Sequence, residues 1–141
     1  MNDSNNTPGS FIFLVLLILF QGLSGLAGGA LLVIDPTGSL LNLPLEILKD
    51  SPFSSFLIPG IILLTVLGIF PIVAGWGLIK NKPWSFMGAL LTGMMLLAWI
   101  IVEVLIIGYQ DEPPLQALYG SVGALILLTL SAPSIRKYLH S

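Results

Sequence analysis

Long apolar stretches separated by short polar segments run through the whole chain. They lie at about residues 11–34, 56–79, 84–108 and 114–131. An α-helix needs about 20 mostly apolar residues to cross the hydrocarbon core of a membrane, and a helix satisfies its own backbone polar groups there. The pattern predicts an all-α integral membrane protein, in which residues 1–141 form a single domain with four transmembrane helices.

The polar connections between these stretches are unequal in length. Residues 81–83 and 110–113 make two tight turns, which predicts antiparallel neighbours in an up-and-down bundle. The first connection, residues 35–55, is longer and opens with the turn sequence Asp-Pro-Thr-Gly. We expect Ser51 and Pro52 to stand at the N-cap and first position of the second helix.

Within the first connection, apolar and charged residues are interleaved. The apolar ones are Leu45, Ile47 and Leu48, and the charged ones are Glu46, Lys49 and Asp50. The piece is too short to span a membrane and too apolar for open water, so it predicts a short amphipathic segment in the headgroup layer or over the end of the bundle.

The few charges indicate how the chain is oriented. Of its five Lys and Arg residues, four follow the second and fourth stretches: Lys80, Lys82, Arg136 and Lys137. By the positive-inside rule both termini are cytoplasmic and the two acidic loops face outward. Five cations cannot build a basic stripe, so binding to nucleic acid is excluded.

Cofactor chemistry finds few ligands in this chain. There is no cysteine, and the single histidine, His140, is one residue from the C-terminus. Thiol redox chemistry and Cys-ligated metals are therefore ruled out, and we expect neither a metal site nor another cofactor.

Small residues follow a helix-packing pattern in the first stretch. Gly25 and Gly29 form a GxxxG pair, with Gly28 beside them, and Gly120 lies in the fourth stretch. Such spacing lets membrane helices approach closely. It predicts packing inside the bundle, with a homo- or hetero-oligomer contact through the first helix, or the floor of a ligand site, as alternatives.

Two prolines interrupt the second stretch. Each removes one helical hydrogen bond and frees the carbonyl four residues earlier. For Pro59 this is the carbonyl of Ser55, and for Pro71 that of Leu67. Both carbonyls are predicted to be acceptors for a partner.

A single acid, Glu103, stands inside an apolar stretch, in WIIVEVLIIGYQ. Such residues are costly in lipid and usually face the bundle interior or a wet cavity. Counted from Gly108, Glu103 lies roughly 7 to 8 Å below the outer boundary. Tyr119 is expected at the same level on the next helix, together with Gly28 and Gly29 of the first helix.

Two further side chains complete the predicted layer. Gln116 lies one turn nearer the outer face, and Trp99, four residues before Glu103, would form an apolar floor. The layer is either a ligand or proton site or a hydrogen-bonded clamp between helices. Catalysis has less support, because no histidine base and no second acid share the layer, and no catalytic residue is predicted.

Several segments resemble a known family. DPTGSLLNLPLEIL, SPFSSFLIPG, KPW, WIIVE and LQALYGSVG, which cover most of the chain from Gly25 to Gly123, are similar to small four-span bacterial membrane proteins of uncharacterised function. The resemblance implies a bacterial inner (cytoplasmic) membrane and carries no activity with it.

Three functions stay open on these grounds. The leading hypothesis is non-enzymatic binding of a lipid or other amphiphile near the outer face, with Glu103, Tyr119, Gln116 and Trp99 lining the site. The second is an accessory or assembly subunit of a larger membrane complex, in contact through the glycine-rich first helix. The third is a small transporter that uses protonation of Glu103.

Overall fold

The computed structural model describes residues 8–41, 43–49, 51–108 and 115–139, and the regular elements in these ranges are all helical. In chain order they are α1 (Gly9–Ile34), the 3₁₀ turns η2 (Ser39–Leu41) and η3 (Leu45–Leu48), α2 (Leu57–Leu64), the π-helical η4 (Thr65–Ile69), α3 (Phe70–Ile79), α4 (Ser85–Ile107), α5 (Leu115–Leu130) and α6 (Pro133–Leu139).

Three helices in the described ranges are long and apolar enough to cross a membrane: Gly9–Ile34, the continuous Leu57–Ile79 and Ser85–Ile106. This confirms the prediction of an all-helical chain suited to membrane insertion. With 16 residues, α5 rises only about 24 Å, less than the roughly 30 Å of the hydrocarbon core. It reaches a spanning length only together with α6, at a bend of 63°.

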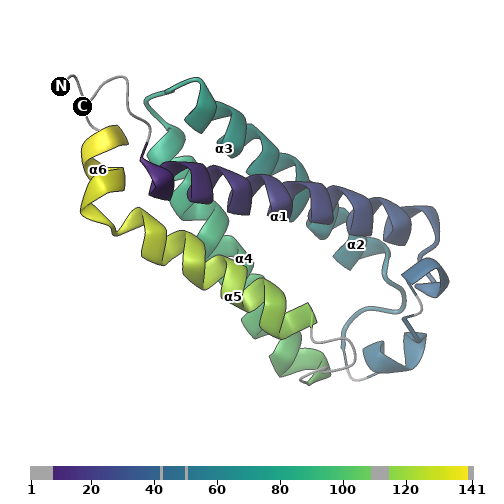
Figure 1. Cartoon of the computed structure of the whole chain (residues 1–141). Coiled ribbons are helices and arrows are strands. Elements are labelled where there is room, and N and C mark those ends of the chain that lie inside the picture. Colours follow the sequence, from purple (N-terminus) through teal and green to yellow (C-terminus); the bar gives the residue numbers. More distant parts are fainter. Residues whose placement is uncertain (1–7, 42, 50, 109–114, 140–141) are drawn as a thin grey trace.

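The helices lie side by side, and contacts of α3 with α4 and of α1 with α5 join the two halves of the chain. α1 contacts α2, η4 and α3, whereas α4 pairs mainly with α5. The start of α1, the turn between α3 and α4, and α6 lie at one end of the molecule, and η2 and η3 lie at the other (Figure 1). From the first end, α1 and α5 diverge toward the second.

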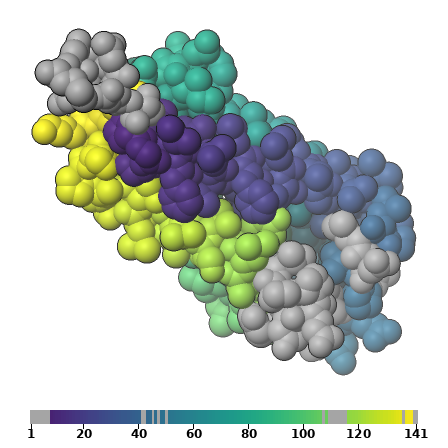
Figure 2. Space-filling view, in the orientation of Figure 1, coloured from purple at the N-terminus to yellow at the C-terminus, as the bar shows by residue number. Residues whose placement is uncertain are grey.

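α6 closes the first of these ends. Its Ile135 is completely buried, and its Tyr138 ring lies 4.7 Å from the ring of Phe11 on α1, centroid to centroid. A hydrogen bond of 2.8 Å between the hydroxyls of Ser10 and Ser134 adds to the contact. The space-filling view shows α6 directly beside the start of α1 (Figure 2).

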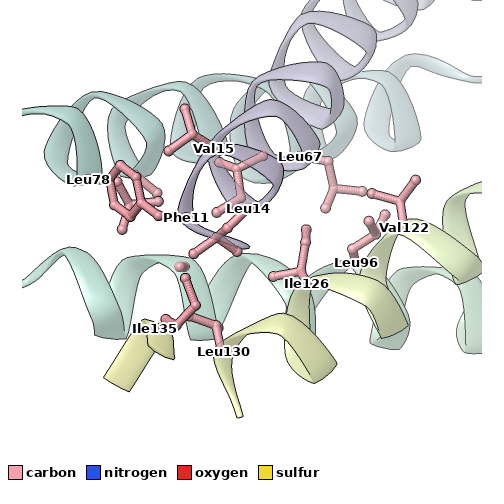
Figure 3. Close-up of a cluster of buried hydrophobic side chains, with 13 residues drawn as sticks. Phe11, Leu14, Val15, Leu67, Leu78, Leu96, Val122, Ile126, Leu130 and Ile135 are labelled. Carbon is pink, nitrogen blue, oxygen red and sulfur yellow. The ribbon is translucent and has the colours of Figure 1, made fainter. Parts of the chain in front are cut away.

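The main core is shared by all the longer helices (Figure 3). Its fully buried members include Leu14, Ile18, Leu67, Leu96 and Ile126. The outside is also apolar, because large hydrophobic side chains such as those of Leu16, Leu105 and Leu128 are exposed. Since lipid offers no hydrophobic drive for helix association, close packing distinguishes this interior from its surroundings.

A second, smaller cluster covers the other end. Leu32, Leu48 and Phe56 are buried together, which joins the end of α1 to the first connection. Glu46 and Lys49 remain exposed beside buried Leu48, the pattern expected of an amphipathic segment. Asp50 and the side chains of Leu45 and Ile47 lie outside the described part of the chain.

The second helix begins later than the sequence predicts. α2 starts at Leu57, not near Ser51 and Pro52. The Ser51 hydroxyl donates to the Leu48 carbonyl and accepts from the Phe53 N–H, so it closes the turn after η3 instead of capping α2.

Candidate functional site

Glu103 lies in the last turns of α4, half-buried against the first turn of α5. Gln116, only 3% exposed, donates from Nε2 to Glu103 Oε1 at 3.0 Å and to the Gly108 carbonyl at 3.2 Å. Gly108 has a φ of +78°, a glycine-favouring conformation that is common just past a helix end. One amide therefore ties the end of α4 to the beginning of α5.

Trp99 is the second neutral side chain beside the carboxyl group. It stands one helical turn before Glu103, and its indole N–H, a donor, is on the Glu103 side, so Trp99 is not simply the apolar floor that the sequence predicts. Within the described residues Glu103 makes no ion pair, and the side chain of Lys49 is exposed. Neutral groups thus hold the acid in place. We call Glu103, Gln116 and Trp99 the Glu103 cluster.

Tyr119 belongs to a different neighbourhood. Its ring stacks on Phe20 of α1, with centroids 6.0 Å apart and planes 18° apart. Phe20 precedes Gly28 by eight residues, or about 12 Å of helix rise, so the prediction that Tyr119 lies level with Gly28 and Gly29 is wrong. The helices diverge (Figure 1), and equal counts from the turns therefore do not give equal levels.

The glycines of α1 face the chain's own second span. A Cβ on Gly25 would lie 2.0 Å from the Leu67 carbonyl oxygen, and one on Gly29 would lie 2.5 Å from the Leu64 backbone nitrogen. Gly28 faces a tip of the Leu63 side chain at 3.3 Å, and Gly120 faces Ile100 at 3.7 Å. Gly25 and Gly29 are thus the positions where backbones meet.

A buried polar contact that the sequence analysis missed lies beside Gly25. Gln21 is 1% exposed and donates from Nε2 to the Leu67 carbonyl oxygen at 3.0 Å. Pro71 has no N–H to give to this carbonyl, so the prediction that Pro71 frees it is confirmed. Gln21 is the only amide or charged side chain between residues 11 and 34, a signal that could have identified it.

The expectation for Pro59 is wrong. Pro59 is the third residue of α2, where a backbone N–H has no partner inside the helix in any case. Ser55 precedes the helix, so Pro59 removes no helical bond from its carbonyl. The break in the second span therefore lies at η4 and Pro71.

In the comparison with known proteins, no protein-family model, curated protein or solved structure matches the chain. The resemblance to small four-span bacterial proteins therefore stays an expectation that rests on the quoted segments. Among the residues that the structure describes, no group of three or more His, Cys, Asp or Glu side chains could hold a metal ion.

Proposed function

We propose that this membrane protein binds a lipid or other amphiphile at the Glu103 cluster, near the outer face of a bacterial inner membrane. One observation carries the proposal: an acid inside an apolar helix is half-buried and hydrogen-bonded by the neutral amide of Gln116, with the neutral indole of Trp99 beside it. Neutral donors orient a carboxyl group without cancelling its charge. It remains a partner for an ammonium or hydroxyl headgroup.

The surroundings suit an amphiphilic ligand. Ile101 and Val102, just before Glu103 on α4, are 58% and 50% exposed. A headgroup at Glu103 would therefore place its apolar tail along a lipid-facing side of α4. Tyr119, whose ring stacks on Phe20 of α1, is not part of the proposed site.

The proposal includes a topology of four crossings, with α5 and α6 together making the fourth. Lys80 and Lys82 follow α3 and Lys137 lies in α6, at the end of the molecule where α1 starts (Figure 1). This common end would be cytoplasmic under the positive-inside rule, and the end with η2 and η3 would face outward.

A helix clamp is the second candidate, and the direct bond from Gln116 to Glu103 favours it. The other two hypotheses have less support. A partner subunit at the glycine face of α1 would have to displace Leu64 and Leu67. A transporter site is usually near the membrane midplane, whereas Glu103 is four residues from the end of α4.

Small molecules that co-purify with the protein test the proposal. The intact chain is extracted into lipid nanodiscs, and bound lipids and amphiphiles are identified by mass spectrometry. Glu103→Gln keeps a hydrogen-bond acceptor for Gln116 but removes the charge. We expect it to lose a species that the native protein retains.

Asp35→Asn is the matched control, because it removes an acid that lies just after the end of α1, outside the cluster. It should retain the bound species. Equal retention by Glu103→Gln and the native protein would contradict ligand binding at Glu103 and leave the clamp. No specifically bound species in any of the three proteins would also count against the proposal.

A further inference from the structure

The amide of Gln21 is paired at one end only. Nε2 donates to the Leu67 carbonyl oxygen, while Oε1 is fully buried and has no hydrogen-bond donor in the part of the chain that the structure describes. A buried acceptor without a donor destabilises the folded state, and native structures satisfy the great majority of such atoms. We therefore expect Gln21 Oε1 to accept a hydrogen bond from a donor outside the described residues.

Reversing the side-chain amide would not remove the problem. The Leu67 carbonyl is an acceptor only, so it requires the NH₂ end of Gln21 to face it. With the amide reversed, two oxygens would face each other and both would lack a donor. The observed orientation is therefore fixed by the carbonyl that Pro71 leaves free.

The helix backbones approach closely around this amide. Gly25, one turn after Gln21 on α1, has no side chain to cover the Leu67 carbonyl. Gly68 packs directly against the α1 backbone, where its Cβ would lie 2.8 Å from the Leu26 nitrogen. The Leu67 carbonyl has two lone pairs, and Gln21 Nε2 uses one of them.

We propose that Gln21 Oε1 and the Leu67 carbonyl form an internal binding site for one small hydrogen-bond donor, a water molecule, at the break in the second span. Water can donate one hydrogen to each oxygen, and internal waters usually have two to four such polar partners. The burial of Gln21 argues against a lipid headgroup here, since a headgroup is too large to enter between closely packed helices. The site is separate from the Glu103 cluster.

Water-edited solid-state NMR on the intact chain in lipid bilayers tests the proposal. With labelled glutamine and isoleucine, the rate of magnetisation transfer from water to the Gln21 side-chain amide is compared with the rate to Ile18. Ile18 is completely buried and lies one turn before Gln21 on α1. We expect transfer to Gln21 to be severalfold faster.

The side-chain carbonyl shift of Gln21 separates water from other donors. Gln21 is assigned through bonds to its own backbone, so no variant has to fold. A hydrogen-bonded carbonyl shift together with fast water transfer supports the site. A hydrogen-bonded shift without water transfer would mean that a protein group donates, and a free-carbonyl shift would mean that nothing does; either result overturns the proposal.

Discussion

Two buried glutamines tie helices together in this protein, and they do so in different surroundings. Gln21 and Gln116 are 1% and 3% exposed, and each donates from Nε2 to an oxygen at 3.0 Å. Gln21 reaches a backbone carbonyl between helices whose backbones touch. Gln116 reaches the half-buried side chain of Glu103.

The difference separates a fixed contact from an adjustable one. The Gln21 contact lies where Gly25 brings the α1 backbone against Leu67, whereas the contact between Glu103 and Gln116 joins two side chains. We therefore interpret the hydrogen bond from Gln21 to the Leu67 backbone as structural, and the hydrogen bond from Gln116 to the Glu103 side chain as one that a ligand could replace. Changes at the two places should differ in size and in kind.

The largest effect is expected from Gly25→Ala. Its Cβ would stand 2.0 Å from the Leu67 carbonyl oxygen and 2.8 Å from the Gly68 nitrogen, which are backbone atoms that cannot turn aside. We expect a loss of about 3 kcal/mol of unfolding free energy, the upper end of what an overpacked core costs. Unfolding in mixed micelles, followed by circular dichroism, measures it.

Gly28→Ala is the matched control for this prediction. Its Cβ would meet only a methyl group of Leu63, at 3.3 Å, and a side-chain tip can shift by a few tenths of an ångström. The two glycines lie three residues apart on α1 and carry the same substitution. Equal losses at Gly25 and Gly28 would contradict the backbone crossing at Leu67.

The next largest loss of unfolding free energy is expected at the Leu67 carbonyl, which Pro71 leaves without a backbone donor. Gln21→Leu removes the amide that donates to the Leu67 carbonyl and should lower the unfolding free energy by about 1–3 kcal/mol. Pro71→Ala restores a backbone N–H at the position that would donate to Leu67 in an α-helix. The cost of Gln21→Leu should therefore be smaller in the Pro71→Ala background.

A double-mutant cycle over Gln21 and Pro71 measures this coupling. Unfolding free energies of the native protein, both single variants and the double variant are compared under one condition. Additive costs would show that the Leu67 carbonyl is not the shared partner of Gln21 and residue 71.

A smaller loss of unfolding free energy is expected at the contact between Gln116 and Glu103. Gln116→Leu removes the donor to Glu103 and Gly108, and polar contacts between membrane helices contribute on average about 0.6 kcal/mol. Glu103→Gln should cost less still, because a glutamine oxygen can accept the same bond. If Gln116→Leu proves as costly as Gln21→Leu in the same micelle assay, the distinction between the two ties fails.

The sequence predicted the composition of the Glu103 cluster better than its depth. Gln116 and Trp99 do reach Glu103, because helical spacing and a short turn restrict which residues can meet. Tyr119 stacks instead on Phe20. The angle between helices, which residue counting cannot supply, decides that contact.

The two prolines show the same limit. Pro71 lies well inside the second helix, so the rule that it frees the Leu67 carbonyl holds. Pro59 lies in the first turn of α2, so it frees no helical carbonyl. The prediction for Pro59 fails because the helix begins later than the sequence predicts. Helix boundaries depend on loop contacts such as that of Phe56 with Leu32 and Leu48, which lie far apart in sequence.

The smallest change in stability is expected at Asp35. Like Glu103, it is a carboxyl group that accepts hydrogen bonds from neutral donors, but it lies in solvent just after the end of α1. Hydrogen bonds from the Ser39 and Thr37 hydroxyls, and from the Thr37 N–H at 3.2 Å, lower the pKa of Asp35 below its usual 3.8. A lowered pKa means that the folded state favours the charged form. The stabilisation is therefore complete above the unfolded pKa and is lost as the pH falls through the folded one.

Melting temperatures of the native protein and Asp35→Asn, measured from about pH 6 to about pH 2, test this linkage. The advantage of the native protein should be constant above about pH 5 and should shrink as the pH falls below 3.8. An advantage that grows on acidification would mean that the folded state raises the pKa of Asp35, and the hydroxyls of Thr37 and Ser39 would then not hold a charged group. A constant advantage down to the lowest pH would show that these bonds act equally on the neutral acid, unlike the charge-dependent role proposed for Glu103.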